Sequence, residues 1–156
     1  GHVMTEESNL AAMIESAIYL CQLQAGKKNI QIDLVCPSDL TLSMNAPLLE
    51  QALVNLIINA VKYSDPEKKV LVLAEEQEEQ VVICVKDEGF GIEHTHLDRL
   101  FERFYRVDTA RSRKLGGTGL GLSIVKHIIQ AHRGEIRVES KVGAGSTFMI
   151  TLPSKL

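Results

Sequence analysis

One predicted helix, from Ala46 to about Tyr63, constrains the fold of this chain more than any other stretch. Apolar residues cover almost its whole circumference, and a helix of that kind has to be buried on nearly every side. Asn45 is a suitable N-cap, and Pro47 stands near the first helical position, where its missing N–H is tolerated. We therefore expect a buried helix that begins directly after Asn45.

A narrow polar seam runs along this helix. It consists of Gln51, Asn55, Asn59 and Lys62. Their spacings of four, four and three residues place all of them on one face. Asparagine is a poor helix former, and buried amides must find partners. The seam faces water, caps the backbone of a neighbour, or faces a ligand, and the apolar surroundings favour the ligand.

The order of the predicted elements indicates the fold class. Helical periodicity over about residues 8–25, with Gly26 as a stop, precedes short strands near 30–34 and 40–42. After the buried helix come strand runs at 70–74 and 81–85, a helix after residue 120, and a C-terminal pair of strands. This mixture favours an α+β fold: a two-layer sandwich whose mixed, mostly antiparallel sheet is covered on one face by about three helices.

Length and composition bound the function. With 156 residues and 45% hydrophobic content, we expect one domain over residues 3–156, after a cloning scar at 1–2. The net charge of −3 argues against a general nucleic-acid binder, and no apolar run approaches the ~20 residues of a membrane span. Three cysteines without metal spacing suit a reducing compartment, so we expect a cytoplasmic domain without membrane contact.

Two glycine-containing segments favour a ligand that carries phosphate. Residues 116–122 are rich in glycine and run directly into a predicted helix, whose N-terminus offers unpaired N–H groups to an anion. The alternative is a flexible loop before a helix. Asp87 stands at the end of a strand and is followed by Gly89 and Gly91, which would let the backbone approach a ligand closely.

The segment at about 92–118 is predicted to be a lid. It carries six of the seventeen basic residues and, near its middle, Phe101, Phe104 and Tyr105. A connection this long within one domain is usually functional or mobile. We expect the aromatic side chains to anchor it and the arginines to meet an anionic ligand. A solvated short helix is the alternative for Arg99 and for residues 111–114.

Five motifs now stand in order: Asn55-x-x-x-Asn59, Asp87-x-Gly89-x-Gly91, Phe101 to Arg106, Gly117 to Leu122, and Gly143 to Phe148. Together they resemble the catalytic ATP-binding domain of bacterial sensor histidine kinases. That superfamily, with the Bergerat ATP-binding fold, includes gyrase B, the ninety-kilodalton heat-shock chaperone and mismatch-repair ATPases. The resemblance covers roughly residues 26–153, and residues 106–118 look most like the phosphate-regulon-type branch.

The resemblance implies ATP and Mg²⁺ as ligands. Asn59 would bind Mg²⁺ with support from Asn55, and Lys62 would reach phosphate. Asp87 would accept a hydrogen bond from the exocyclic amine of adenine. Asn55, Lys62 and Arg106 are implied as catalytic residues, with Arg106 at the γ-phosphate. The implied nucleotide-binding residues are Asn55, Asn59, Lys62, Tyr63, Asp87, Gly89, Gly91, Ile92, Tyr105, Arg106, Gly117, Thr118, Gly119, Leu120, Gly121, Leu122 and Thr147, the last supporting Asp87.

The residue type at position 55 bears on whether such a domain hydrolyses ATP or transfers its phosphate. ATP-hydrolysing relatives carry a glutamate there that activates water, and an amide is no general base. The resemblance therefore implies transfer of the γ-phosphate to a histidine in two-component signal transduction. The alternatives are an ATP-driven conformational module of the gyrase or chaperone type, and a serine kinase of the anti-sigma type.

The phosphoacceptor histidine of that family, which lies in a helical dimerisation domain, has no counterpart among these residues. His127 and His132 read as surface or core residues, and His94 with His96 lacks a third metal ligand. We therefore expect an isolated, monomeric catalytic domain that does not phosphorylate itself. Its partners would be its own dimerisation domain and, indirectly, a response regulator. The parent protein would be a membrane-anchored sensor.

Overall fold

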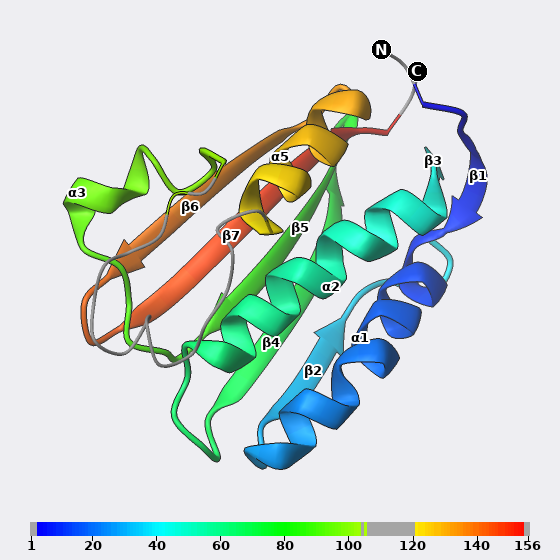
Figure 1. The fold of residues 1–156 in the computed structure, drawn as a ribbon. Helices are drawn as coiled ribbons and strands as arrows, with labels where there is room; N and C mark the ends of the chain where they lie inside the picture. The colour runs from blue at the N-terminus through cyan, green and yellow to red at the C-terminus, as the bar shows by residue number, and fades with distance from the viewer. Residues whose placement is uncertain (1–2, 104, 106–120, 155–156) are drawn as a thin grey trace.

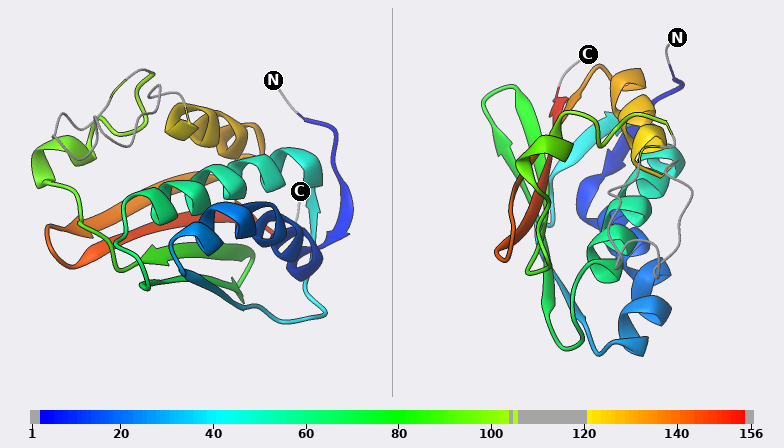
Figure 2. Two further views of the ribbon diagram at one scale, coloured as in Figure 1. Left: turned by 60° about the horizontal axis from the view of Figure 1, so that its bottom comes forward. Right: turned by 60° about the vertical axis from the view of Figure 1, so that its left-hand side comes forward.

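The computed structural model describes residues 3–103, 105 and 121–154. They form two layers (Figure 1), in which three helices cover one face of a five-stranded sheet: α1 (Leu10–Lys27), α2 (Ala46–Lys62) and α5 (Gly121–Ala131). The views in Figure 2 show that all three lie on the same side of the sheet. The predicted α+β sandwich is confirmed.

The sheet is mixed, and one pairing makes it so. Its strands lie in the order β2 (Gln31–Val35), β4 (Lys69–Gln77), β5 (Gln80–Asp87), β7 (Gly145–Pro153) and β6 (Glu135–Lys141). Strands β2 and β4 pair in parallel, with α2 in the connection between them, and the other pairs are antiparallel. A separate two-stranded sheet joins β1 (Glu6–Asn9) to β3 (Thr41–Met44).

Helix α2 packs between α1 and α5 and lies over the sheet (Figure 1). It begins where the sequence predicts, because the Asn45 side chain accepts a hydrogen bond of 3.1 Å from the Leu48 N–H. Apolar side chains from all three helices and the sheet meet in a continuous core. On α2 the buried members are Leu49, Ala52, Leu53, Leu56, Ile57, Ala60 and Val61. The expectation of a buried helix is confirmed. In its polar seam Asn55, Asn59 and Lys62 are half-buried, and Gln51 is exposed.

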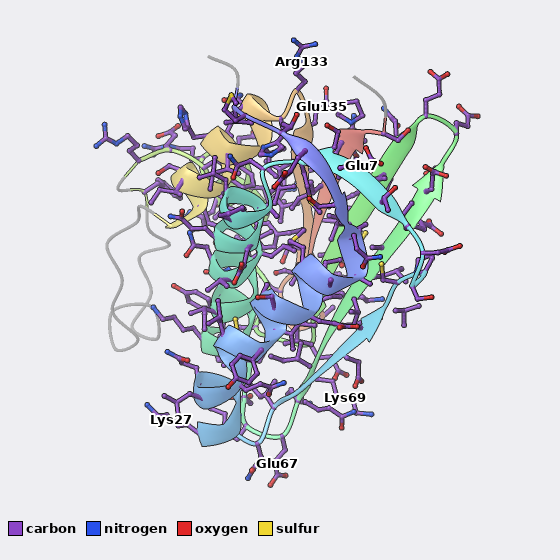
Figure 3. All side chains as sticks on the ribbon, turned by 90° about the vertical axis from the view of Figure 1, so that its right-hand side faces the viewer. Glu7, Lys27, Glu67, Lys69, Arg133 and Glu135 are labelled. Atoms are coloured by element: carbon purple, nitrogen blue, oxygen red, sulfur yellow. The ribbon has the colours of Figure 1, made fainter. Side chains whose placement is uncertain are left out.

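The first helix differs from its predicted bounds at both ends. Asn9 caps it by accepting a hydrogen bond of 2.8 Å from the Ala12 N–H, and the residues before Asn9 form β1. Gly26 is not the stop, since the helix continues to Lys27 and the chain turns at Asn29, which has φ of 52°. Lys27 and Glu67 project outward at this end of the domain (Figure 3).

Part of the predicted lid is described. Helix α3 (His94–Leu97) lies near the start of this segment, and the turns that follow place Leu100 in the core. Phe101 packs edge-on against Phe148, with ring centroids 6.1 Å apart, so an aromatic side chain does anchor this segment. No helix among the described residues has both the length and the apolarity needed to cross a membrane.

Candidate nucleotide-binding site

The polar seam of α2 offers two half-buried amides. Asn55 and Asn59 lie one turn apart, and within the described part of the chain neither side chain makes a hydrogen bond. Within the described residues no buried side-chain nitrogen or oxygen lacks a hydrogen-bond partner, so the polar atoms of these two amides are open to solvent or to a ligand. Lys62 and Tyr63, also half-buried, follow at the end of the helix. The seam therefore presents amide oxygens and an ammonium on one side, as a phosphate and cation site requires.

Asp87 is a buried carboxylate at the end of β5, only 7% exposed. Its Oδ1 accepts hydrogen bonds from the Gly89 N–H at 2.8 Å and from the Ser146 N–H at 3.1 Å. Burial raises the pKa of this carboxyl above its ordinary value, while the two backbone N–H groups act in the opposite direction. The two donors fix the orientation of the carboxyl group, so that Oδ2 is the oxygen able to accept from a ligand.

The glycines after Asp87 are required by contacts within the protein. A Cβ on Gly89 would lie 2.3 Å from the Tyr63 carbonyl oxygen, and a Cβ on Gly91, with φ of +76°, would lie 2.1 Å from the Lys141 carbonyl oxygen. The Phe90 N–H donates to that same Tyr63 carbonyl at 3.0 Å. The Asp87 loop thus approaches the end of α2 closely, which joins two predicted motifs. The approach of this loop to a ligand stays a prediction.

The assignment of Thr147 as the support for Asp87 is corrected. Thr147 pairs with Lys86 and Glu139, both exposed, and strand alternation puts it on the sheet face opposite Asp87. The neighbouring Ser146 holds Asp87 instead, through its backbone N–H. Its hydroxyl in turn lies 2.7 Å from the hydroxyl of Ser140.

Ser140 is a residue that the sequence did not single out. Its hydroxyl oxygen accepts from the Ile92 N–H at 2.8 Å and donates to the Gly145 carbonyl at 3.0 Å. It therefore connects the beginning of the predicted lid to the start of β7, which carries Ser146. Ile92, a predicted nucleotide-binding residue, is half-buried here and also packs on the core. The one sequence signal for Ser140 is that it is a polar residue in a strand with alternating polarity.

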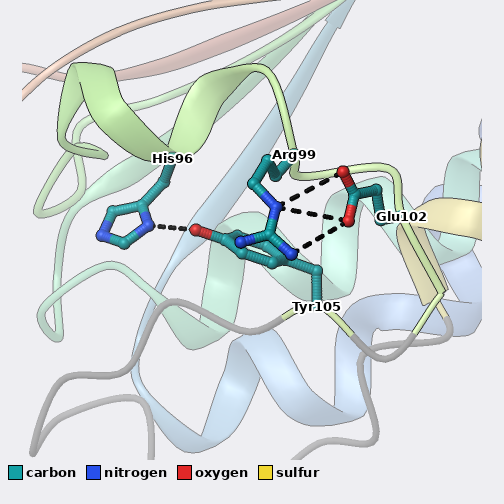
Figure 4. Close-up of polar contacts among 4 residues, drawn as sticks. All are labelled: His96, Arg99, Glu102 and Tyr105. Atoms are coloured by element: carbon teal, nitrogen blue, oxygen red, sulfur yellow. Dashed lines mark hydrogen bonds and ion pairs between the residues drawn. The ribbon is translucent and has the colours of Figure 1, made fainter.

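Tyr105 is surrounded by residues of its own segment (Figure 4). Its hydroxyl hydrogen-bonds to His96 Nδ1, and the Arg99 guanidinium lies 4.5 Å from the ring centroid. Arg99 also forms an ion pair of 3.2 Å with Glu102. These contacts stabilise one arrangement of the short segment after α3. That Tyr105 binds nucleotide stays a prediction.

The remaining predicted residues divide in two. Gly121 and Leu122 begin α5, where Gly121 is exposed and Leu122 packs on the core. The others lie outside the described residues: Arg106, Gly117, Thr118, Gly119 and Leu120. Within the described part of the chain, no group of His, Cys, Asp and Glu side chains is arranged to hold a metal.

Comparison with known proteins identifies the class. The family model of histidine kinase-, DNA gyrase B- and HSP90-like ATPases matches residues 44–156, so the chain belongs to this family. The sensor-like histidine kinase SenX3 of Mycobacterium tuberculosis is 42% identical over 142 residues, which cover 91% of this chain and 35% of SenX3. The sensor histidine kinase WalK of Bacillus subtilis is 48% identical over 119 residues, 75% of this chain and 20% of WalK. The chain thus spans about a third or less of these relatives.

Solved structures agree with this assignment. The catalytic domain of the histidine kinase ThkA superposes with a TM-score of 0.84 at 27% identity, covering 97% of both chains. ThkA has also been solved in complex with the response regulator protein TrrA, and that structure matches with a TM-score of 0.80 at 25% identity, covering 97% of this chain and 42% of the other. The described fold is therefore that of a histidine kinase catalytic domain.

Proposed function

We propose that this chain binds Mg-ATP and donates the γ-phosphate to a histidine on a separate dimerisation domain. The observation that carries the proposal is the junction of α2 with the Asp87 loop. Asn59 and Asn55 lie about one and two turns before this junction on α2 and are half-buried, and the buried carboxylate of Asp87 lies at the end of β5 beside it. One end of this site suits an adenine and the other suits phosphate with a cation.

At the adenine end, Asp87 selects the base. Its Oδ1 is held by the Gly89 and Ser146 N–H groups, and its Oδ2 accepts a hydrogen bond from the exocyclic amine of adenine. Guanine has a carbonyl at that position, and two facing acceptors repel each other. We therefore infer a preference for ATP over GTP. Tyr63, at the end of α2, provides an aromatic surface for the base.

At the phosphate end, Asn59 would hold Mg²⁺ with Asn55 beside it. A neutral amide oxygen is a hard ligand, and Mg²⁺ keeps several waters and is completed by phosphate oxygens. The half-buried amides of Asn55 and Asn59 fit this role, and bound Mg²⁺ would neutralise phosphate charge. Lys62 adds a positive charge on the same face. Arg106, Tyr105 and the glycines at 117, 119 and 121 complete the proposed site from the lid and the start of α5.

The reaction class follows from Asn55. An amide cannot remove a proton from water, so the site favours transfer to an acceptor that is itself a nucleophile. An imidazole nitrogen attacks the γ-phosphorus, the bond to the bridging oxygen breaks, and ADP leaves. The acceptor histidine would lie on the dimerisation domain of the same parent protein, and a response regulator would receive the phosphoryl group next. We further propose that the parent is a membrane-anchored sensor and this part of it is cytoplasmic.

The test is phosphorylation of a supplied dimerisation domain. The chain is mixed with labelled Mg-ATP and a histidine-containing dimerisation domain from a SenX3-like kinase, and acid-labile label on that domain is measured. We expect transfer with the wild type, loss with Asn59→Ala, and normal transfer with Gln51→Ala, which changes an exposed amide on the same helix. Steady ATP hydrolysis without any acceptor and without transfer would favour an ATPase module instead.

A further inference from the structure

Lys28 makes an unusual set of contacts at the end of α2. Its ammonium donates to the carbonyl oxygens of Val61 at 2.8 Å, Lys62 at 3.1 Å and Ser64 at 2.7 Å. An ammonium has three N–H donors, so these contacts use its full capacity. The last carbonyls of a helix lack partners within the helix and carry its partial negative charge. One cation from the turn between α1 and β2 therefore completes the end of the helix that carries the seam.

The same turn holds the chain after α2 a second time. The Lys28 carbonyl accepts from the Glu67 N–H at 2.8 Å. In the same segment, Ser64 is fully buried and its hydroxyl donates to the Ala60 carbonyl at 2.7 Å. Partial burial lowers the pKa of Lys28, while the charge of Asp65 acts to raise it. The ammonium and the carbonyl of Lys28 together hold residues 61–67 against the end of α1.

A short chain of backbone hydrogen bonds leads from these residues to Asp87. The Tyr63 carbonyl accepts from the Phe90 N–H at 3.0 Å, and the Phe90 carbonyl accepts from the Gly143 N–H at 2.8 Å. Gly89, between Asp87 and Phe90, lies so close to the Tyr63 carbonyl that a Cβ would be 2.3 Å from it. A shift of the end of α2 would therefore displace the Asp87 loop as well.

We propose that Lys28 is a positioning residue for the nucleotide site, acting through the end of α2 and the Asp87 loop. Among the described residues its ammonium donates to three backbone carbonyls, with the charge of Asp65 nearby, so we expect its effect on a nucleotide to be indirect. It sets where Lys62 and Tyr63 leave the helix, and through Phe90 it sets the position of Asp87. The inference rests on the proposed function for the identity of the ligand and on the described contacts for the connection.

The test compares Lys28→Met with Lys27→Met. Methionine keeps an unbranched side chain but removes the ammonium, and Lys27 is an exposed lysine next in the chain that points away from the domain (Figure 3). Mg-ADP affinity is measured by calorimetry, and hydrogen exchange of the Phe90 amide is followed without nucleotide. For Lys28→Met we expect about tenfold weaker Mg-ADP binding and faster Phe90 exchange, because charged hydrogen bonds are lost. Lys27→Met should match the wild type in both.

A second variant, Lys28→Arg, keeps the test decisive if Lys28→Met does not fold. Arginine keeps the charge, but its planar fork does not direct three donors at three converging carbonyls. We expect it to fold, with Mg-ADP affinity and Phe90 exchange between those of the wild type and Lys28→Met. The proposal would be overturned if Lys28→Arg, and Lys28→Met if it folds, kept the wild-type Mg-ADP affinity and the wild-type Phe90 exchange rate and lost only melting temperature. If the wild type itself bound no adenine nucleotide, the proposed function would fail, and Phe90 exchange would still test the connection.

Discussion

Replacing Asp87 with asparagine should change which base the site accepts. The substitution keeps the size of the side chain. The Gly89 and Ser146 N–H groups, at 2.8 and 3.1 Å from Oδ1, require an acceptor there, so they orient the new amide with its oxygen toward them. The NH₂ group then occupies the position of Oδ2. With adenine, this NH₂ donor faces the exocyclic amine, which is also a donor. With guanine, the NH₂ group donates a hydrogen bond to the carbonyl oxygen.

The magnitude follows from what is lost and gained. For adenine, one hydrogen bond to a charged acceptor is lost and two donors face each other, at a cost of about 2–4 kcal/mol. Mg-ADP affinity should therefore fall about 30- to 700-fold at 1.4 kcal/mol for each factor of ten. For guanine the same change replaces a repulsive pair with a hydrogen bond, so Mg-GDP affinity should rise.

The assay is calorimetric titration of both proteins with Mg-ADP and Mg-GDP. Glu88→Gln is the matched control, because it removes the next carboxylate, which is exposed, and should leave both affinities unchanged. The reasoning would be refuted if Asp87→Asn bound Mg-ADP as the wild type does, or if it lost both nucleotides equally while remaining folded.

Four other outcomes are expected. In calorimetric scans at pH 7, Asp87→Asn should melt no lower than the wild type, and the difference in melting temperature should narrow toward pH 4. The reason is that the pKa of the Asp87 carboxyl is raised in the folded protein. Such a group contributes stability below its unfolded pKa, near 3.8, and this stability is lost as the pH rises through its folded pKa. Asn59→Ala should remove the gain in ADP affinity that Mg²⁺ gives, measured by titration with and without the metal. Gly91→Ala should lower the free energy of unfolding by about 2–4 kcal/mol in urea, since its Cβ would lie 2.1 Å from the Lys141 carbonyl oxygen. Leu53→Ala, at a site 1% exposed, should cost about 3 kcal/mol in the same assay, and a loss below 1 kcal/mol would contradict its place in the core.

Much of the fold followed from local patterns. The apolar circumference of α2, its cap at Asn45 and the strand runs predicted the layers correctly, because helix burial and capping depend on residues close in sequence. Strand β1 was missed, since Glu6, Glu7 and Ser8 have no apolar alternation and pair with β3 through their backbone. A strand of that kind leaves no hydrophobic signal to detect.

The site was predicted less completely than the fold. Asn55, Asn59 and Asp87 carry a chemical signature that a single helix or strand end displays, and the structure brings their segments together. Thr147 was assigned from the family resemblance, and the residue that holds Asp87 is its neighbour Ser146, because one position along a strand changes the face. Lys28 gave no signal, since its partners lie 33 to 36 residues away and are backbone atoms. The roles of Arg106 and residues 117–120 stay predictions.

The central claim is that the end of α2 and the Asp87 loop form one nucleotide site, and amide chemical-shift mapping with Mg-ADP tests it most directly. The largest shifts should fall on residues 55–64, 87–92 and 145–147. Leu71 and Leu73, on strand positions that alternate with the buried core residues of β4, should be unaffected. Large shifts on those β4 residues, with the end of α2 and the Asp87 loop unchanged, would contradict the account.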